Sequence, residues 1–452
     1  MKVKKIIKKI TACLLGSIMV LSVVGCSQGE GKNNKNSTNS GTTNATDTTK
    51  AEEQITLKFL YIWPEYEETM TKTIEGFEKE NPNIKVEVAV CPWDQVQKVL
   101  QTRIASGDQP DVSFMWPHRM APYVENGQAL DITPYMTDEW KNTFASEDEL
   151  IKDTKDGKLY NIPFKGTAPV IFYNKDMYDE NDITFPQYVE DVPAIGDKLK
   201  SKDITMFGLA GKPNGFGFIN ILKQLTYADT IYDLKVSKTD EWVTGRMFTD
   251  DISNSYAKAM QNISGWVKNG YVSTNNLTQT ASEAQTLFAN GKVSCIAGNN
   301  NELNAIKELV DFNVGVTTSP LYKSVNEKAL IAATFDGFFA SGTTKYPEES
   351  AALLKYLTSK DVQTMWVKEC NATPVVKDIQ IDDPSQAEVA KLFEYFVPDQ
   401  QFLDYTVDQE ATWAMQAEIL ANKNATEKDY QEYGKKMTEY FKEKAEEYDA
   451  NK

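Results

Sequence analysis

In residues 55–115, apolar positions follow strand spacing and helix spacing in turn. Short apolar runs at 55–62, 84–90 and 112–115 predict strands, whereas 65–80 and 94–106 carry apolar residues at helical spacing. The run at 112–115 is too short for a helix and is typical of a strand covered on both faces of its sheet. These elements predict a β-α-β-α-β unit, which is characteristic of an α/β fold.

A tryptophan follows each of these three strands and lies beside a proline. The three residues are Trp63, Trp93 and Trp116. In open α/β sheets, ligands bind beyond the carboxyl ends of the strands. Flat aromatic rings at that edge can stack on the C–H surfaces of sugar rings. We therefore expect an aromatic rim for a ligand, with core packing as the alternative because tryptophan is highly buried on average.

Helical and strand patterns continue through the rest of the chain. Further helices are predicted at 217–226, 250–268, 281–289, 346–358, 409–421 and 427–448, and further strands at 168–173, 291–300 and 331–341. The last helix carries one apolar stripe, which predicts a packing face and consists of Tyr430, Tyr433, Met437, Phe441 and Tyr448. About 400 folded residues exceed what one core usually covers, so we expect two lobes.

Residues 1–25 have the features of a lipoprotein signal peptide. Five lysines precede an apolar centre, and Gly25 and Cys26 follow it. A membrane anchor is the less favoured alternative, because a span needs about 20 apolar residues. Lipid on Cys26 would hold the mature protein on the outer face of the cell membrane. Residues 26–53 are too polar to bury a core and predict a disordered tether, with a reach on the order of 30 Å.

Charge and cysteine content narrow the function classes. The net charge is −17, and an acidic body without a basic stripe argues against nucleic acid and anionic lipid surfaces as partners. Three cysteines of the body, Cys91, Cys295 and Cys370, have no regular spacing, which favours buried free thiols over a disulfide framework or a metal site. The single histidine, His118, cannot form a metal-binding cluster. We expect no cofactor.

The order of four segments resembles the family 1 extracellular solute-binding proteins of bacterial ABC importers, the maltose-binding-like group. The segments are the strand that ends at Trp63, FEKENPNIKV at 77–86, IASGDQPDV at 104–112 and YNKD at 173–176. The resemblance runs from about Gln54 to the C-terminus. It implies a periplasmic-binding-protein-like fold, in which a hinge joins two α/β lobes with the ligand cleft between them.

The resemblance also implies a division into lobes. Residues 54–168 and 318–357 are assigned to the N-terminal lobe, and 169–317 and 358–452 to the C-terminal lobe, with a first hinge near 167–169. Residues 157–164 resemble a family segment that runs toward the cleft. Residues 291–300 resemble a block whose last aromatic residue lines the ligand site, and Asn300 occupies that position here.

Candidate ligand-binding residues come from the rim, the hinge strands and a C-terminal helix. Hydroxyl partners are expected among Lys165, Thr167, Asn299, Asn300 and Asp336, although each alone could equally be a cap, a turn or a surface group. The other candidates are Tyr61, Trp63, Trp93, Trp116, His118, Phe216 and Trp413. Of these, Trp413 matches a family helix position that stacks on sugar in maltose binders. Packing roles are expected for Trp242, Trp266 and Trp366.

The rim differs from that of the maltose-binding relatives. Their rim reads Trp-Ala-His-Asp-Arg, whereas residues 116–119 read Trp-Pro-His-Arg and lack the aspartate. The resemblance therefore does not extend to malto-oligosaccharide specificity.

Three function classes were compared. A glycoside hydrolase needs two carboxylates that flank the bond, and the sequence pairs none; nucleophile-elbow, zinc-protease and phosphate-loop motifs are also missing. An adhesin or scaffold would more often show internal repeats. A binding protein needs export, a tether, two lobes and an aromatic and polar cleft, all of which are expected here. We therefore predict a binding protein and no enzyme.

The predicted ligand is a carbohydrate, with an oligosaccharide preferred. Binding would close the two lobes, because the ligand contacts both only in the closed form. The resemblance implies delivery by a monomer to ABC transporter permease subunits that a cytoplasmic ATPase drives. A polyamine or another small polar solute is the alternative, because an acidic rim with an aromatic box would bind it as well.

Overall fold

The computed structural model describes residues 54–145, 150, 156–211, 221–222, 225–226, 250–273, 275–323, 331–393, 396–398 and 409–450. The chain divides into two compact units after Ala51, and all of these residues belong to the second unit. The predicted signal peptide, tether, Cys26, Phe216 and Trp242 lie outside the described residues. Within the described stretches, no helix combines the length and apolar character that a membrane span requires.

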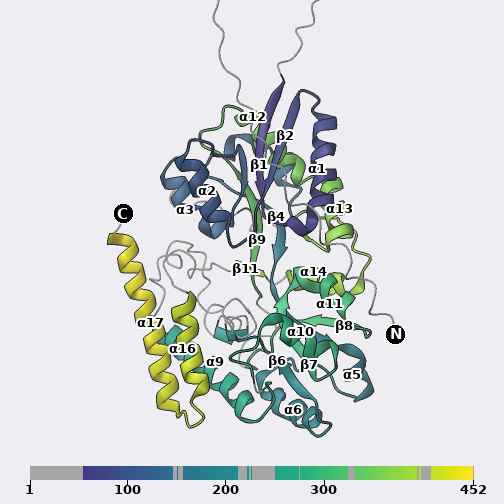
Figure 1. Ribbon diagram of the computed structural model, residues 1–452, viewed down its shortest axis with the longest axis vertical. Helices are drawn as coiled ribbons and strands as arrows, with labels where there is room; N and C mark the ends of the chain where they lie inside the picture. Colours follow the sequence, from purple (N-terminus) through teal and green to yellow (C-terminus); the bar gives the residue numbers. More distant parts are fainter. Residues whose placement is uncertain are drawn as a thin grey trace, which may run out of the picture. The chain divides into compact units, whose positions relative to one another are not determined.

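The predicted β-α-β-α-β unit is confirmed. Its elements are β1 (Ile55–Tyr61), α1 (Glu67–Glu80), β2 (Ile84–Val90), α2 (Val96–Ala105) and β3 (Val112–Phe114) (Figure 1). β1 pairs in parallel with both β2 and β3, so it lies between them. A 3-10 turn, η1 (Pro64–Tyr66), separates β1 from α1, because a proline is favoured at the first position of a helical turn.

Helices cover both faces of this first sheet. α1 buries Met70, Ile74 and Phe77 against it, at the spacing of one helix face. On the other side, α2 and α3 (Ala121–Glu125) contribute Leu100 and Tyr123 to a separate apolar cluster. All three residues of β3 are buried, as predicted for a strand enclosed on both faces.

Strands from distant parts of the chain complete the first sheet. Its order is β10-β4-β9-β3-β1-β2, with β11 paired to β9. β9 (Ile331–Ala340) runs antiparallel to both β3 and β4 (Ile162–Thr167). The short strands are β10 (Thr373–Pro374) and β11 (Phe396–Pro398). The sheet that holds the rim therefore depends on residues more than 200 positions after β3.

The second sheet has the order β6-β7-β5-β8. Its strands are β5 (Pro169–Asn174), β6 (Thr205–Gly208), β7 (Val293–Asn299) and β8 (Val314–Thr317). The larger of its apolar clusters includes residues of α6 (Val192–Lys200), α9 (Asp250–Lys268), α16 (Gln409–Ala421) and α17 (Glu427–Ala450). The other includes residues of α10 (Ala281–Ala289), α11 (Leu303–Leu309) and α14 (Pro384–Leu392). Other helices are α4 (Asp138–Lys141), α5 (Lys175–Glu180) and α12 (Pro347–Leu357).

Several packing predictions are confirmed. Four residues of the predicted stripe on α17 are buried in the core of the second sheet; these are Tyr430, Tyr433, Met437 and Phe441. The side chain of Tyr448 lies outside the described residues. Trp266 is buried and stacks on Phe207, with ring centroids 5.1 Å apart. Cys91, Cys295 and Cys370 are buried free thiols.

The chain changes sheets between β4 and β5, which only Ala168 separates. This crossing lies within the predicted hinge region of 167–169, and its motion stays a prediction. The return from β8 to β9 occurs later than the predicted 317/318 boundary. Tyr322 is still buried in the core of the second sheet, and Leu321 forms an isolated β-bridge with Tyr188.

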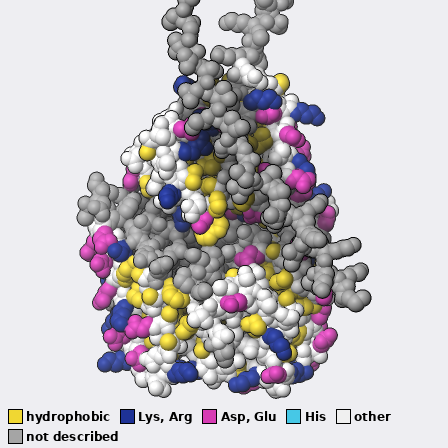
Figure 2. All heavy atoms as spheres, in the orientation of Figure 1, with side chains coloured by type: hydrophobic (Ala, Val, Ile, Leu, Met, Phe, Trp, Pro, Cys, Tyr) yellow, Lys and Arg dark blue, Asp and Glu magenta, His cyan; other side chains and the backbone are white. Residues whose placement is uncertain are grey.

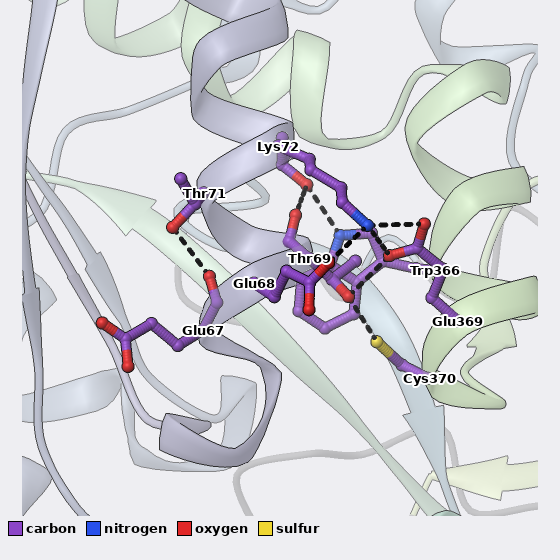
Figure 3. Close-up of polar contacts among 9 residues, drawn as sticks. Glu67, Glu68, Thr69, Thr71, Lys72, Trp366, Glu369 and Cys370 are labelled. Carbon is purple, nitrogen blue, oxygen red and sulfur yellow. Dashed lines mark hydrogen bonds and ion pairs between the residues drawn. The ribbon is translucent and has the colours of Figure 1, made fainter.

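The chain after residue 357 differs from the predicted lobe division. α13 (Lys360–Cys370) packs on α1 in the first sheet's core (Figure 3), where the Trp366 indole donates to Thr73 Oγ1 at 2.9 Å. Lys72 on α1 pairs with Glu369 at 3.2 Å. β10 then pairs with β4, and α14 packs on both β8 and β10. The chain therefore reaches the second sheet after Pro374, before β11 pairs with β9 of the first sheet.

Candidate functional site

A buried ion pair lies where β4 and β9 run side by side. Lys165 and Asp336 are register partners of this antiparallel pair, so their side chains leave the sheet on the same face. Lys165 Nζ lies 2.6 Å from Asp336 Oδ2, and the two side chains are 3% and 6% exposed. Desolvating two charges is costly, and such a pair persists only when further polar contacts hold it.

Those contacts come from two further donors. The Trp116 indole N–H donates to Asp336 Oδ1 at 3.0 Å, and the Thr167 hydroxyl donates to Asp336 Oδ2 at 3.1 Å. We call Asp336, Lys165, Thr167 and Trp116 the carboxylate cluster. Sequence analysis singled out all four residues, and the structure brings them together.

Lys165 is held more by charge than by directed hydrogen bonds. Among the described residues, its ammonium makes no hydrogen bond of normal geometry. Its Nζ lies over the ring of Trp63, 4.7 Å from the ring centroid. The aromatic face offers the cation a second favourable contact besides the carboxylate.

Trp116 is a partly exposed member of the carboxylate cluster, as is Thr167. It follows β3 at the start of the 3-10 turn η2 (Pro117–Arg119). Phe114 meets its ring in a T-shaped contact at 4.9 Å. The Arg119 guanidinium lies over the same ring, 4.5 Å from the centroid. Sequence analysis missed this contact, although residues three apart in a 3-10 turn lie on the same side.

Trp63 and Tyr61 do not lie on an accessible rim. Trp63 is 4% exposed and Tyr61 is 2% exposed, and both belong to the first sheet's core. α13 covers this end of β1, because Trp366 meets Trp63 in a T-shaped contact at 5.8 Å. The core-packing alternative therefore describes these two residues in this structure. The packing role predicted for Trp366 is confirmed.

Trp93 has the opposite environment. It is 47% exposed and follows β2, which is the edge strand of the first sheet. Val88 and Val90 on the same strand are also exposed. An edge strand has a neighbour on one side only, so apolar residues near its end stay accessible. Of the three predicted rim tryptophans, Trp93 and Trp116 present surface and Trp63 does not.

Asn300 and Asn299 have structural partners. Asn300 is 2% exposed; its Oδ1 accepts from the Ala168 N–H at 2.8 Å, and its Nδ2 donates to Thr373 Oγ1 at 2.8 Å and to the Gly166 carbonyl at 3.1 Å. Its amide thus ties the crossing at Ala168 to β10. Asn299 is the N-cap residue of the 3-10 turn η6 (Asn300–Glu302), and its backbone N–H donates to the Glu302 carboxylate at 2.8 Å. The cap reading weighed from the sequence describes Asn299.

Of the other candidates, only the Trp413 side chain lies within the described residues. Trp413 on α16 is partly exposed and donates its indole N–H to the Gly211 carbonyl. The backbone of His118 lies in η2, and its side chain is outside the described residues, as is Phe216.

Tyr66 was not among the predicted site residues. Its ring meets Trp366 in a T-shaped contact at 5.7 Å. Burial raises the pKa of its phenol well above the usual value.

The face drawn in Figure 2 shows the charge distribution. Lysine and arginine side chains are interspersed there with aspartate and glutamate side chains. A nucleic-acid-binding surface would instead gather basic side chains in a patch or stripe. This face therefore gives no support to a nucleic-acid partner, in line with the net charge of −17.

Two curated relatives are sugar-binding proteins by name. The multiple sugar-binding protein of Streptococcus mutans is 25% identical over 345 residues, which are 74% of this chain and 78% of that protein. The maltodextrin-binding protein MdxE of Bacillus subtilis is 25% identical over 318 residues, which are 68% of this chain and 71% of that protein.

Solved structures share the fold. The apo form of RafE from Streptococcus pneumoniae is 22% identical and has a TM-score of 0.71 over 87% of this chain and 98% of that one. Such neighbours have the periplasmic-binding-protein-like α/β fold with two lobes, and this chain has it too. The model of the bacterial extracellular solute-binding proteins matches residues 63–364. This chain therefore belongs to the bacterial extracellular solute-binding protein family.

Proposed function

We propose that this protein captures a carbohydrate outside the cell, with an oligosaccharide as the preferred ligand. The observation that carries the proposal is Trp116, a partly exposed residue beyond the carboxyl end of β3 whose indole N–H is bonded to buried Asp336. A flat ring beside fixed polar groups is the kind of surface that carbohydrates use. The names of the relatives from Streptococcus mutans and Bacillus subtilis support a sugar as ligand.

Polyamines fit the aromatic groups less well. The Arg119 guanidinium lies over Trp116, and the Lys165 ammonium lies over Trp63. A polyamine would need these aromatic faces for its own ammonium groups. The protein's own cations would repel it, since like charges brought together at a binding surface cost several kcal/mol.

We further propose that binding closes the two lobes and that the closed form delivers the ligand to an ABC permease. A ligand that contacts both lobes favours the closed state by its differential affinity for it. The first crossing between the sheets is short, since only Ala168 separates β4 from β5. Lipid on Cys26 would keep the monomer close to that permease. The protein would act as a binder and not as an enzyme.

A thermal-shift screen tests the proposed ligand class. The mature protein is heated with raffinose, maltotriose, xylotriose, chitotriose, putrescine and spermidine in separate samples. A ligand present at 100 times its Kd adds about 2.7 kcal/mol to the free energy of unfolding. We expect at least one glycan to raise the Tm of the protein and the Trp116→Ala variant to lose most of this rise.

Each other outcome has a defined meaning. A rise with the two polyamines alone would show that the ligand class is wrong. If a glycan raises the Tm of the Trp116→Ala variant as much as that of the wild type, the binding surface does not include Trp116. The control is Trp266→Phe, because Trp266 packs on Phe207 in the core of the second sheet.

A further inference from the structure

The Asp336 carboxylate is enclosed by donors of the protein itself. Its Oδ1 accepts a hydrogen bond from the Trp116 indole N–H. Its Oδ2 accepts one from the Thr167 hydroxyl and forms an ion pair with the Lys165 ammonium. The side chain is 6% exposed. Sequence analysis predicted Asp336, Lys165 and Thr167 as direct partners of ligand hydroxyls. With both oxygens engaged and little surface left, the carboxylate is poorly suited to that task.

Trp116 differs from Asp336 because it is partly exposed, whereas Asp336 is buried. The indole N–H anchors one edge of this ring to a charged acceptor, and charge-assisted hydrogen bonds are about twice as strong as neutral ones. Phe114 contacts the ring at 4.9 Å, and Arg119 lies over it. Any rotation of the ring would break the bond to Asp336.

We infer that Asp336 is a positioning residue, which fixes the Trp116 ring for the ligand and makes no ligand contact itself. Lys165 keeps the buried carboxylate paired with a charge, and Thr167 holds its second oxygen beside the crossing at Ala168. The buried ion pair thus orients Trp116 through the hydrogen bond from its indole N–H to Asp336. This inference rests on the proposed function.

A double-mutant cycle on ligand affinity tests the inference. Trp116→Phe keeps an aromatic ring and removes the N–H. Lys165→Met combined with Asp336→Leu removes the carboxylate without leaving a buried charge, an exchange that is often tolerated. The probe is raffinose or maltotriose, whichever raises the Tm of the wild type more, and the measurement is Kd by titration calorimetry.

Both changes should weaken binding about tenfold, because each removes the same charged hydrogen bond. Their combination should weaken it no further, since residues that act through one contact are not additive. Lys165→Met with Asp336→Asn retains an acceptor for the indole and should restore most of the affinity. A combined loss of about a hundredfold, or an asparagine variant as weak as the leucine variant, would overturn the inference.

A second readout needs no ligand. In the ¹⁵N NMR spectrum, the Trp116 indole signal is assigned by its loss in Trp116→Phe. We expect this signal to shift and its hydrogen exchange to accelerate in the Lys165→Met/Asp336→Leu variant. The matched control is the buried Trp140 indole, which donates to Thr358 at 2.8 Å and should not change.

An unchanged Trp116 signal would also refute the inference. If no glycan binds but the Trp116 signal responds, the positioning contact stands and the proposed function fails. The two failures are therefore distinguishable.

Discussion

At the scale of single residues, burial separates structural charges from surface charges. The pair of Lys165 and Asp336 is almost fully buried, at 2.6 Å. The pair of Lys72 and Glu369, drawn in Figure 3, joins side chains that are 43% and 36% exposed, at 3.2 Å. Solvent screens an exposed pair, whereas a buried charge without its partner stays uncompensated.

Lys165→Met should therefore destabilise the protein strongly. Removal of one partner of a buried ion pair costs about 3–5 kcal/mol. The matched control, Lys72→Met, should cost much less, because exposed pairs contribute little. Urea unfolding measures both changes. An equal loss of unfolding free energy in the two variants would mean that burial does not make the ion pair of Lys165 and Asp336 more important for stability.

At the scale of elements, a single carboxylate starts α14 and ties it to α11. Asp383 caps α14, where its Oδ1 accepts from the Gln386 N–H at 3.0 Å. Its Oδ2 pairs with Lys307 on α11 at 2.6 Å. Burial opposes ionisation, but the contacts with Lys307 and the backbone N–H groups outweigh it and hold the pKa of Asp383 below its usual value.

Asp383→Asn should cost about 0.5–1 kcal/mol at pH 7, since the amide keeps the cap but loses the charge of a partly exposed pair. A folded-state pKa below the unfolded value stabilises the protein above the unfolded pKa, and this stabilisation is lost as the pH falls through the folded pKa. The difference between variant and wild type should therefore begin to shrink near pH 4 and disappear only below the folded-state pKa.

Asp383→Ala serves as the comparison, because it also removes the cap and should cost about 1 kcal/mol more. Thermal unfolding between pH 7 and pH 3 measures both variants. A loss for Asp383→Asn that persists undiminished at pH 3 would exclude the charge as its cause.

At the scale of the whole molecule, the described elements begin after the first compact unit of the chain, Met1–Ala51. Sequence analysis expected the folded body to begin at about Gln54, and β1 begins at Ile55. The signal peptide and lipid site lie outside the described residues, so the anchor stays a prediction. An anchored binding protein would remain near its permease in the absence of ligand.

Cys26→Ser tests the anchor. A protein without lipid lacks the buried acyl chains that hold it to the bilayer, at about 0.8 kcal/mol per CH₂ group. We expect the wild type in the membrane fraction and the variant in the medium or as an unprocessed precursor. Cys91→Ser is the control, because Cys91 is a buried free thiol of the body. Equal membrane association of all three proteins would contradict the predicted lipidation.

The sequence by itself determined much of the local structure. α9 and α10 have the predicted bounds, and the stripe on α17 packs as expected, because helical periodicity is a local property of the chain. The β-α-β-α-β unit was predictable for the same reason. The order of the quoted segments also identified the family correctly.

Only the tertiary structure decided which predicted site residues are accessible. Trp63 and Trp93 follow strands of similar pattern, yet β1 is central and lies under α13, whereas β2 is an edge. The bond between Trp366 and Thr73 spans 293 residues. The carboxylate cluster exists because β9 inserts between β3 and β4. Periodicity carries no information on such long-range pairing, because sheet order is set by packing across the whole chain.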